Sequence, residues 1–266
     1  MKSTALFLVF LWIHLTAGAQ NTFPYSFNTN SMYITLVGGC AQAAALQLPD
    51  PVLTSENIEA LNAEAINKFD KNATLQFSPS ANTHSDYTLG IVMAAPGAIA
   101  ASELGRSGWN HAMVYSGMYL ETFLLTNGVK DLTKDIVQRT RPLFYNTDLT
   151  LDERAALAAA GDGRTSFYSG HTAVAFSSAV FLASTYDELY DNKTVSYALW
   201  TSGIGLATAT GYLRFKAGKH FPSDILTGAI IGAAMGYCVP KAHLSNTKNW
   251  TLTPGTNSLT LQYHLR

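Results

Sequence analysis

Three short stretches of the sequence gather residue types that could bind and cleave a phosphate ester. The third and richest, GYLRFKAGKHFPSD, contains Arg214, His220 and Asp224. His220 and Asp224 are four residues apart, so a helix that begins near Phe221-Pro222 would bring the carboxylate beside the ring. Such pairing fixes the tautomer and leaves the other ring nitrogen nucleophilic. A bend at Ala217-Gly218 would return the Arg214 guanidinium to the same site. Taken alone, the stretch could equally be a solvated basic loop.

The second stretch, SFYSGHTAVAFSSAVF, runs from a small polar turn into an uncharged, helix-like segment. Ser169 is expected to cap the helix, and Gly170 would let the backbone approach a ligand closely. The first amides of the helix and its dipole favour an anion, and His171 would stand beside that anion as a general acid. The alternative is an ordinary helix start with an incidental histidine.

The first stretch, VKDLTKDIVQRTRPLFYN, places Lys134 and Arg141 seven residues apart. Two helical turns separate them, so we expect both on one helix face, with the helix ending at Pro142. Two long cations would then converge at a helix C-terminus. Without a partner anion this would be a solvated face, and the neighbouring Lys130 and Arg139 keep that alternative open.

In series, the three stretches closely resemble the three signatures of the type 2 phosphatidic acid phosphatase (PAP2) and vanadium haloperoxidase superfamily. The matching motifs are Lys134-x6-Arg141-Pro142, Ser169-Gly170-His171 and Arg214-x5-His220-x3-Asp224. The resemblance covers roughly residues 86 to 240. It departs at Tyr168, where the family usually has proline, and at Leu213, where it usually has serine. Neither position supplies the attacking nitrogen or a cation.

The resemblance implies an all-α protein, a single helical bundle that works through a phosphohistidine. His220 would attack phosphorus as the nucleophile, Asp224 would orient His220, and His171 would protonate the leaving alcohol as the general acid. A further set of residues would bind the phosphate oxygens: Lys134, Arg141, Ser169, Gly170 and Arg214. No metal ion or other cofactor is implied, and vanadate is expected to act as an inhibitor.

Three functional classes follow from these residues. The leading one is a phosphatase acting on phosphomonoesters or on lipid phosphates and diphosphates. A vanadate-dependent haloperoxidase would use the same residues, although that branch resembles much larger chains. An inactive phosphate-binding protein is the third, motivated by Tyr168 and Leu213. The expected partner is a phosphorylated small molecule or lipid. Nucleic acid is not expected, because a net charge of −1 provides no basic surface.

The first residues resemble a secretory signal peptide, residues 1–19. Lys2 precedes an apolar run from Ala5 to Leu15, and Ala17-Gly18-Ala19 forms a small-residue cleavage pattern. We therefore expect an exported protein, in a bacterial periplasm, that begins near Gln20. An uncleaved anchor is the alternative, although the apolar run is shorter than the ~20 residues that span a bilayer.

Most of the chain is expected to be helical. The weakly charged stretches are 31–49, 87–102, 110–128, 172–185, 195–213 and 225–240. The stretch 110–128 contains Glu121, and of the stretches without a charged residue only 31–49 and 195–213 reach the ~18 residues that argue for a membrane span. We therefore favour buried core helices in a soluble or membrane-associated bundle, with an integral membrane protein as the alternative.

The chain is expected to form one domain. An N-terminal helix and polar loop (20–85) would include a helix over Ser55–Asn67 beside the mouth of the site. The catalytic core (86–240) would follow, and the tail (241–266) would form a β-hairpin around Pro254-Gly255. Cys40 and Cys238 could form a disulfide or remain two buried thiols.

Overall fold

The computed structural model describes residues 23–27, 29–49, 52–159, 161–244, 250–254 and 259–263. Its α-helices are α2 (Thr29–Ala45), α3 (Ser55–Glu59), α4 (Pro79–Ala94), α5 (Pro96–Arg106), α6 (Trp109–Val137), α7 (Leu151–Ala158), α8 (Gly170–Leu189), α9 (Lys193–Lys216) and α10 (Pro222–Ala242). Short 3₁₀ helices cover Ala63–Ala65, Lys71–Leu75 and Pro142–Tyr145. Strands β1 (Trp250–Pro254) and β2 (Leu259–Tyr263) pair antiparallel. The all-α class and the hairpin are confirmed, whereas the expected signal peptide (1–19) lies outside the described residues.

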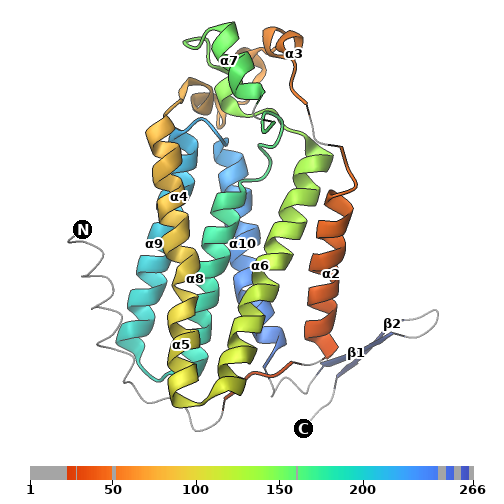
Figure 1. Ribbon diagram of the computed structural model, residues 1–266, viewed down its shortest axis with the longest axis vertical. Coiled ribbons are helices and arrows are strands. Elements are labelled where there is room, and N and C mark those ends of the chain that lie inside the picture. The colour runs from red at the N-terminus through yellow and green to blue at the C-terminus, as the bar shows by residue number, and fades with distance from the viewer. Residues whose placement is uncertain are drawn as a thin grey trace.

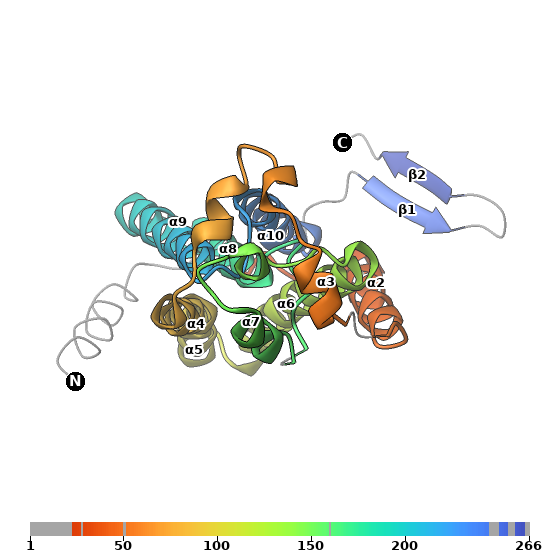
Figure 2. The same cartoon turned by 90° about the horizontal axis from the view of Figure 1, so that it is seen from above.

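Helix α8 is the central helix of the bundle. Helices α4, α6, α9 and α10 all pack against it (Figures 1 and 2). Its sequence has no charged residue from 172 to 186, and small, apolar and hydroxyl side chains occupy this stretch. Hydroxyl groups such as Ser177 and Thr185 donate to backbone carbonyls of the preceding turn, at 3.0 and 2.7 Å. A helix that is uncharged on every face can therefore be surrounded by neighbours.

A row of glycines brings α10 unusually close to α8. Gly228, Gly232 and Gly236 are spaced by four residues and therefore share one face. A Cβ at Gly232 would lie 2.1 Å from the carbonyl oxygen of Ala173, and one at Gly236 would lie 2.3 Å from that of Ser177. Only glycine permits this approach, which sets the position of α10 beside the start of α8.

The three sequence motifs meet at one end of the bundle. Helices α6 and α9 end there, and α8 and α10 begin there (Figure 1). Lys134 and Arg214 lie in the last turns of their helices, whereas His171 and Asp224 lie in first turns. Helices α3 and α7, in the long connections, lie over this end (Figures 1 and 2).

The first motif is not continuous helix, so the expectation that Lys134 and Arg141 share a helix face is wrong. Helix α6 ends at Val137, and Gln138 takes a left-handed conformation with φ 48°. Arg141 is extended, with φ −71° and ψ 149°, because it precedes Pro142 and proline disfavours a helical residue before it. The two cations therefore approach the site from different elements.

Two other helices differ from expectation. The helix predicted over Ser55–Asn67 ends at Glu59 and is capped by Thr54 rather than Ser55. The side chain of Asn62 accepts a hydrogen bond from the backbone of Glu64, which competes with continued helix. The stretch 87–102 is divided between α4 and α5. Cys40 and Cys238 are free and exposed, so neither the disulfide nor the pair of buried thiols is found.

Two helical stretches are long and apolar enough to cross a membrane, namely Pro79–Arg106 (α4 with α5) and α10. In the most apolar window of each, only 22% and 28% of the residues are buried. The expectation that such helices are core helices is therefore wrong for these two. Among the described residues, neither 31–49 nor 195–213, the stretches singled out by their length, meets the same criterion.

Candidate active site

A cavity of about 470 Å³ lies at the end of the bundle where the three motifs meet. It is lined by Asn82, Asp86, Leu89, Met93, Phe123, Asn127, Lys130, Lys134, Arg141, Asp162, Gly170, His171, Val174, Arg214, Lys219 and His220. Six of the eight residues predicted for the site are therefore at its wall. Ser169 and Asp224 are fully buried and are not among the lining residues.

Arg141 is held rigidly and keeps one donor group unused. Its Nε donates to the carbonyl oxygen of Asp162 at 2.7 Å, and its Nη2 donates to Thr165 Oγ1 at 3.0 Å. Nη2 also forms an ion pair with the Asp162 carboxylate at 3.2 Å. The buried Nη1 has no hydrogen-bond partner among the described residues. A buried donor without a partner is costly, so an anion in the cavity would satisfy it.

Arg214 is anchored in a similar way, by two residues of α4. Its Nη1 donates to Asn82 Oδ1 at 2.7 Å and lies 3.4 Å from Ser85 Oγ. Its buried Nε has no partner among the described residues. The predicted bend that returns the chain toward this arginine is confirmed, because Gly218 has φ +69° and a Cβ there would meet the Gln76 carbonyl. Two anchored guanidinium groups thus each offer an unpaired N–H.

The cavity is strongly electropositive. Burial, together with the charges of Arg141 and Lys130, lowers the pKa of Lys134 to about 7. Burial and the Arg141 charge lower the pKa of Arg214 to about 10. Desolvation disfavours the charged forms of Lys134, Arg141 and Arg214, so a phosphate dianion among them would stabilise all three.

His220 is held in the tautomer that a nucleophile needs. Its Nδ1 lies 2.7 Å from the carbonyl oxygen of Ser166. A carbonyl only accepts, so Nδ1 carries the proton and Nε2 keeps its lone pair. Burial, followed by the charges of Arg141 and Arg214, holds the pKa of His220 well below its usual range. The ring is therefore neutral and nucleophilic at neutral pH.

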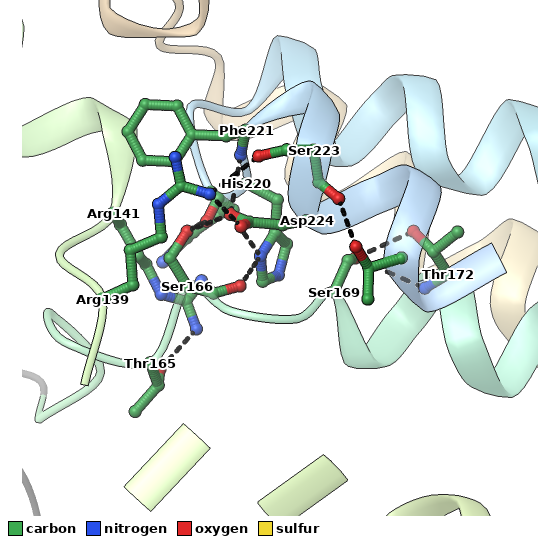
Figure 3. Close-up of polar contacts among 12 residues, drawn as sticks. Arg139, Arg141, Thr165, Ser166, Ser169, Thr172, His220, Phe221, Ser223 and Asp224 are labelled. Atoms are coloured by element: carbon green, nitrogen blue, oxygen red, sulfur yellow. Dashed lines mark hydrogen bonds and ion pairs between the residues drawn. The ribbon is translucent and has the colours of Figure 1, made fainter. Parts of the chain in front are cut away.

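Asp224 lies beside the imidazole, as the spacing predicted, but it is not within hydrogen-bond distance of the ring. Its Oδ2 is 3.9 Å from His220 Nδ1 and instead accepts hydrogen bonds from Ser166 Oγ at 2.6 Å and Phe221 N at 2.9 Å (Figure 3). Asp224 is the third residue of α10, where a carboxylate turns back to cap the first amides of the helix. Ser166 thus contacts both groups, because its hydroxyl donates to Asp224 and its carbonyl oxygen accepts from His220.

Arg139, which the sequence suggested only as a solvated neighbour, clamps this assembly (Figure 3). Its Nη1 donates to Asp224 Oδ1 at 2.5 Å and its Nη2 to Asp70 Oδ2 at 2.7 Å. Its guanidinium carbon lies 4.0 Å from the centre of the Phe221 ring. Asp70 also accepts from the backbone N–H of Ser223 at 3.0 Å. The position of Arg139 inside the first motif was the only available sign of this role.

The start of α8 confirms the predicted cap. Ser169 Oγ accepts from the backbone N–H of Thr172 at 3.4 Å. Because its hydroxyl also pairs with Thr172 Oγ1 at 2.8 Å, Ser169 positions the helix start from behind the cavity wall. Gly170 lies at the wall itself, and His171 follows it.

His171 has a carboxylate partner that the sequence did not reveal. Its Nε2 is 2.8 Å from Oδ1 of Asp86, a residue of α4. Burial and the charge of Arg214 lower the pKa of His171 to about 4, while Asp86 opposes this shift. The two departures from the family pattern, Tyr168 and Leu213, are not among the residues that line the cavity.

Comparisons with known proteins identify the family. The model of the PAP2 superfamily matches residues 116–248, half of the chain. A lipid A 4'-phosphatase of Porphyromonas gingivalis is 32% identical over 88 residues, which is 33% of this chain and 34% of that protein. The match thus spans about a third of that relative's length.

A solved structure, described as the first transmembrane PAP2 type phosphatidylglycerolphosphate phosphatase from Bacillus subtilis, aligns with 79% of this chain and 92% of its own. The TM-score is 0.47 and the sequence identity is 18%. The family match covers half of the chain and includes every predicted site residue. The chain belongs to the PAP2 superfamily.

Proposed function

We propose that the protein is a metal-independent phosphatase that hydrolyses lipid phosphates through a phosphohistidine intermediate at His220. One observation carries this proposal. Two buried arginines, Arg141 and Arg214, each leave one N–H without a partner in a cavity that also contains an imidazole with a free lone pair. A tetrahedral oxyanion satisfies both donors and presents phosphorus to the ring.

In the first step, the lone pair of His220 Nε2 forms a bond to phosphorus as the bond from phosphorus to the leaving oxygen breaks. Arg141, Arg214 and Lys134 stabilise the charge on the three equatorial oxygens. The protonated His171 gives its proton to the leaving oxygen, which departs as an alcohol.

In the second step, water attacks the phosphohistidine. His171, now neutral, accepts a proton from the water as its oxygen bonds to phosphorus. The bond between phosphorus and Nε2 breaks, which restores the lone pair of His220 and releases inorganic phosphate. The cations that hold the oxygens supply the charge stabilisation that magnesium supplies in other phosphatases.

The shape and lining of the cavity favour an amphiphilic substrate. Its polar end carries the cations, whereas Leu89, Met93, Phe123 and Val174 supply an apolar part between α4, α6 and α8. A phosphate headgroup would occupy the polar end and the attached hydrocarbon the apolar part. The match to a lipid A 4'-phosphatase supports the same substrate class.

The outer face of α10 supports association with a membrane. Its exposed large side chains are Leu226, Ile230 and Tyr237, at 54%, 62% and 48% exposure. They lie on the opposite side of the helix from the glycines that contact α8, and no charged residue interrupts them. Exposed apolar faces of this length suit a lipid environment better than water. Export to the periplasm is part of the same proposal and predicts a purified protein that begins near Gln20.

The test is phosphate release in the presence of EDTA, measured with a micellar phosphatidate, an isoprenoid diphosphate and p-nitrophenyl phosphate. We expect turnover of the lipid substrates that vanadate inhibits, because vanadate resembles the five-coordinate phosphorus of the transition state. Rapid acid-free quenching with a ³²P-labelled substrate should trap label on the wild-type protein and none on His220→Ala.

A requirement for a divalent metal, or labelling of His220→Ala equal to that of the wild type, would overturn the mechanism. Absence of turnover with every substrate in folded protein would overturn the phosphatase assignment. A preference for p-nitrophenyl phosphate over the lipids would overturn the lipid substrate alone.

A further inference from the structure

We propose that Asp86 is the positioning residue of the leaving-group acid: its carboxylate holds the ring of His171 and stabilises its imidazolium form. This inference rests on the proposed function and adds to it a residue of α4. Asp86 lies outside residues 116–248, the segment that the PAP2 model matches. Its assignment therefore comes from the tertiary structure of this chain.

The contact is direct and lies in the cavity. Asp86 Oδ1 is 2.8 Å from His171 Nε2, and both residues line the cavity wall. A carboxylate only accepts, so Nε2 carries a proton. The nitrogen that Asp86 does not hold, Nδ1, is then the one that can give its proton to the leaving oxygen.

The two histidines of the cavity are held by different kinds of acceptor. His220 donates to an uncharged backbone carbonyl, that of Ser166, whereas His171 is paired with the carboxylate of Asp86. A carboxylate favours the charged form of a histidine much more than a carbonyl does. The arrangement therefore suits His220 to remain a neutral nucleophile and His171 to carry a proton. Enzymes commonly give two groups of the same type different roles through their environments in this way.

The remaining charges around His171 explain why a carboxylate is useful there. Arg214 from α9 and Lys134 from α6 disfavour its protonation, as does burial. The other charged or titratable residues at the cavity wall are Lys130, Arg141, Asp162, Lys219 and His220. A bound phosphate dianion would oppose the effect of these cations and favour protonation of His171. The Asp86 carboxylate would act in the same direction.

Helix α4 organises a second site residue in the same way. Asn82, one turn before Asp86, accepts a hydrogen bond from Arg214 at 2.7 Å. The face of α4 that carries Asn82 and Asp86 thus holds both a phosphate-binding cation and the proposed acid. Helix α4 thus forms part of the cavity wall, beside the residues of the three motifs.

Electrons and protons are both accounted for in this step. As the bond from phosphorus to the leaving oxygen breaks, its electron pair passes to that oxygen. The oxygen takes the Nδ1 proton of His171, and the Nε2 proton stays in its hydrogen bond to Asp86. His171 ends as a neutral imidazole and accepts the proton of the attacking water in the next step.

The experiment compares wild type, Asp86→Asn and Asp86→Glu with a poor leaving group, an alkyl phosphate, and a good one, p-nitrophenyl phosphate. Asp86→Asn should lower kcat for the alkyl phosphate by about 10- to 100-fold, the usual effect of removing a supporting partner. It should affect p-nitrophenyl phosphate much less, because a good leaving group needs little protonation. Asp86→Glu should restore much of the loss. Asp191→Asn, an exposed substitution between α8 and α9, is the matched control and should behave as wild type.

The pH dependence of kcat distinguishes this role from a purely structural one, because loss of a structural contact would not shift the profile. Removing the carboxylate lowers the pKa of His171, so the alkaline limb of the kcat profile should move to lower pH in Asp86→Asn. In His171→Ala, adding Asp86→Asn should cause no further loss, because Asp86 acts through His171.

An NMR titration of the His171 ring tests the same contact without turnover. A pKa of His171 that is unchanged in Asp86→Asn would overturn the inference even in an active enzyme. Equal losses on both substrates, or a further loss in the double variant, would also overturn it. Absence of phosphatase activity in the wild type would instead overturn the proposed function, and with it the role of His171 as acid.

Discussion

The two histidines of the cavity differ mainly in the groups that hold their rings. His220 is enclosed, with 1% of its surface exposed, and donates to a backbone carbonyl. His171 is partly open to the cavity and is paired with Asp86. Arg214 and Lys134 lower the pKa of both rings, and only His171 has a carboxylate partner that opposes this shift. One cavity therefore holds two histidines whose rings are supported by different kinds of acceptor.

The low pKa of His220 predicts a loss of stability as the pH falls. Below about pH 6.5 the unfolded chain binds a proton at this histidine and the folded protein does not, so the free energy of unfolding falls with decreasing pH. His220→Gln should reduce this loss by about 1.4 kcal/mol per pH unit over that window. Thermal unfolding at pH 7, 6 and 5 measures it. His84→Gln, at an exposed histidine of α4, should keep the wild-type slope, and equal slopes in wild type and His220→Gln would contradict the prediction.

Arg139 is predicted to be essential for both stability and turnover. Arg139→Ala would leave the buried carboxylates of Asp70 and Asp224 without their cation, which costs about 3–5 kcal/mol for a broken buried pair. The melting temperature and kcat should both fall, because Asp224 also positions Ser166. Lys71→Ala, which removes an exposed ion pair to Glu64, should change stability by less than about 1 kcal/mol. Similar melting temperatures for the two variants would refute this role of Arg139.

The four helices that carry the sequence motifs bring their ends to the site. Helices α8 and α10 present their first turns, and α6 and α9 present their last turns, so amides and side chains converge on the cavity. The position of α10 beside α8 depends on the row Gly228, Gly232 and Gly236. A shift of α10 would move Asp224 and the loop that carries His220 together. Helix packing far along the bundle thus controls geometry at its end.

Gly232→Ala should therefore reduce activity although it lies two helical turns from Asp224. The added Cβ would sit 2.1 Å from the Ala173 carbonyl oxygen, which forces the helices apart. We expect a destabilisation of about 1–3 kcal/mol, as for overpacking of a core, and a lower kcat. Gly205→Ala is the matched control, because a Cβ there meets nothing within 4 Å. It should be neutral or stabilising by up to about 1 kcal/mol. Equal melting temperatures and rates in the two variants would exclude this role of the glycine row.

The buried helix α8 and the outer helix α10 carry different kinds of side chain. Helix α8, the buried helix, has many alanines, serines and threonines, whereas α10 exposes leucine, isoleucine and tyrosine. A protein surrounded by water would place charged residues on such an outer face. The exposed apolar face of α10 supports the proposed association with a membrane.

Ile230→Glu should therefore reduce membrane insertion. Ile230 is 62% exposed on α10, and a buried carboxylate in hydrocarbon costs several kcal/mol. The wild-type protein should remain in the membrane pellet after alkaline carbonate extraction, and Ile230→Glu should accumulate less there. Lys193→Glu, at the exposed start of α9, is the control and should accumulate normally. Extraction of the wild type by carbonate would show that the outer face does not contact lipid.

The sequence by itself determined the features that depend on neighbours along the chain. The Ser169 cap, the start of α10 at Pro222 and the bend at Gly218 were all predicted, because each depends on residues within one or two turns. The order of the three motifs also identified the family and six of the residues that line the cavity.

Only the tertiary structure decided which groups hold the predicted site residues. Ser166 binds His220 across 54 residues, and Arg139 and Asp86 reach Asp224 and His171 across 85. Spacing placed Asp224 beside His220 correctly, but capping of α10 directs the hydrogen bonds of this carboxylate oxygen to the Phe221 amide and the Ser166 hydroxyl instead. Such contacts depend on how separate helices pack against one another, and the pattern of side chains within one helix does not specify that register.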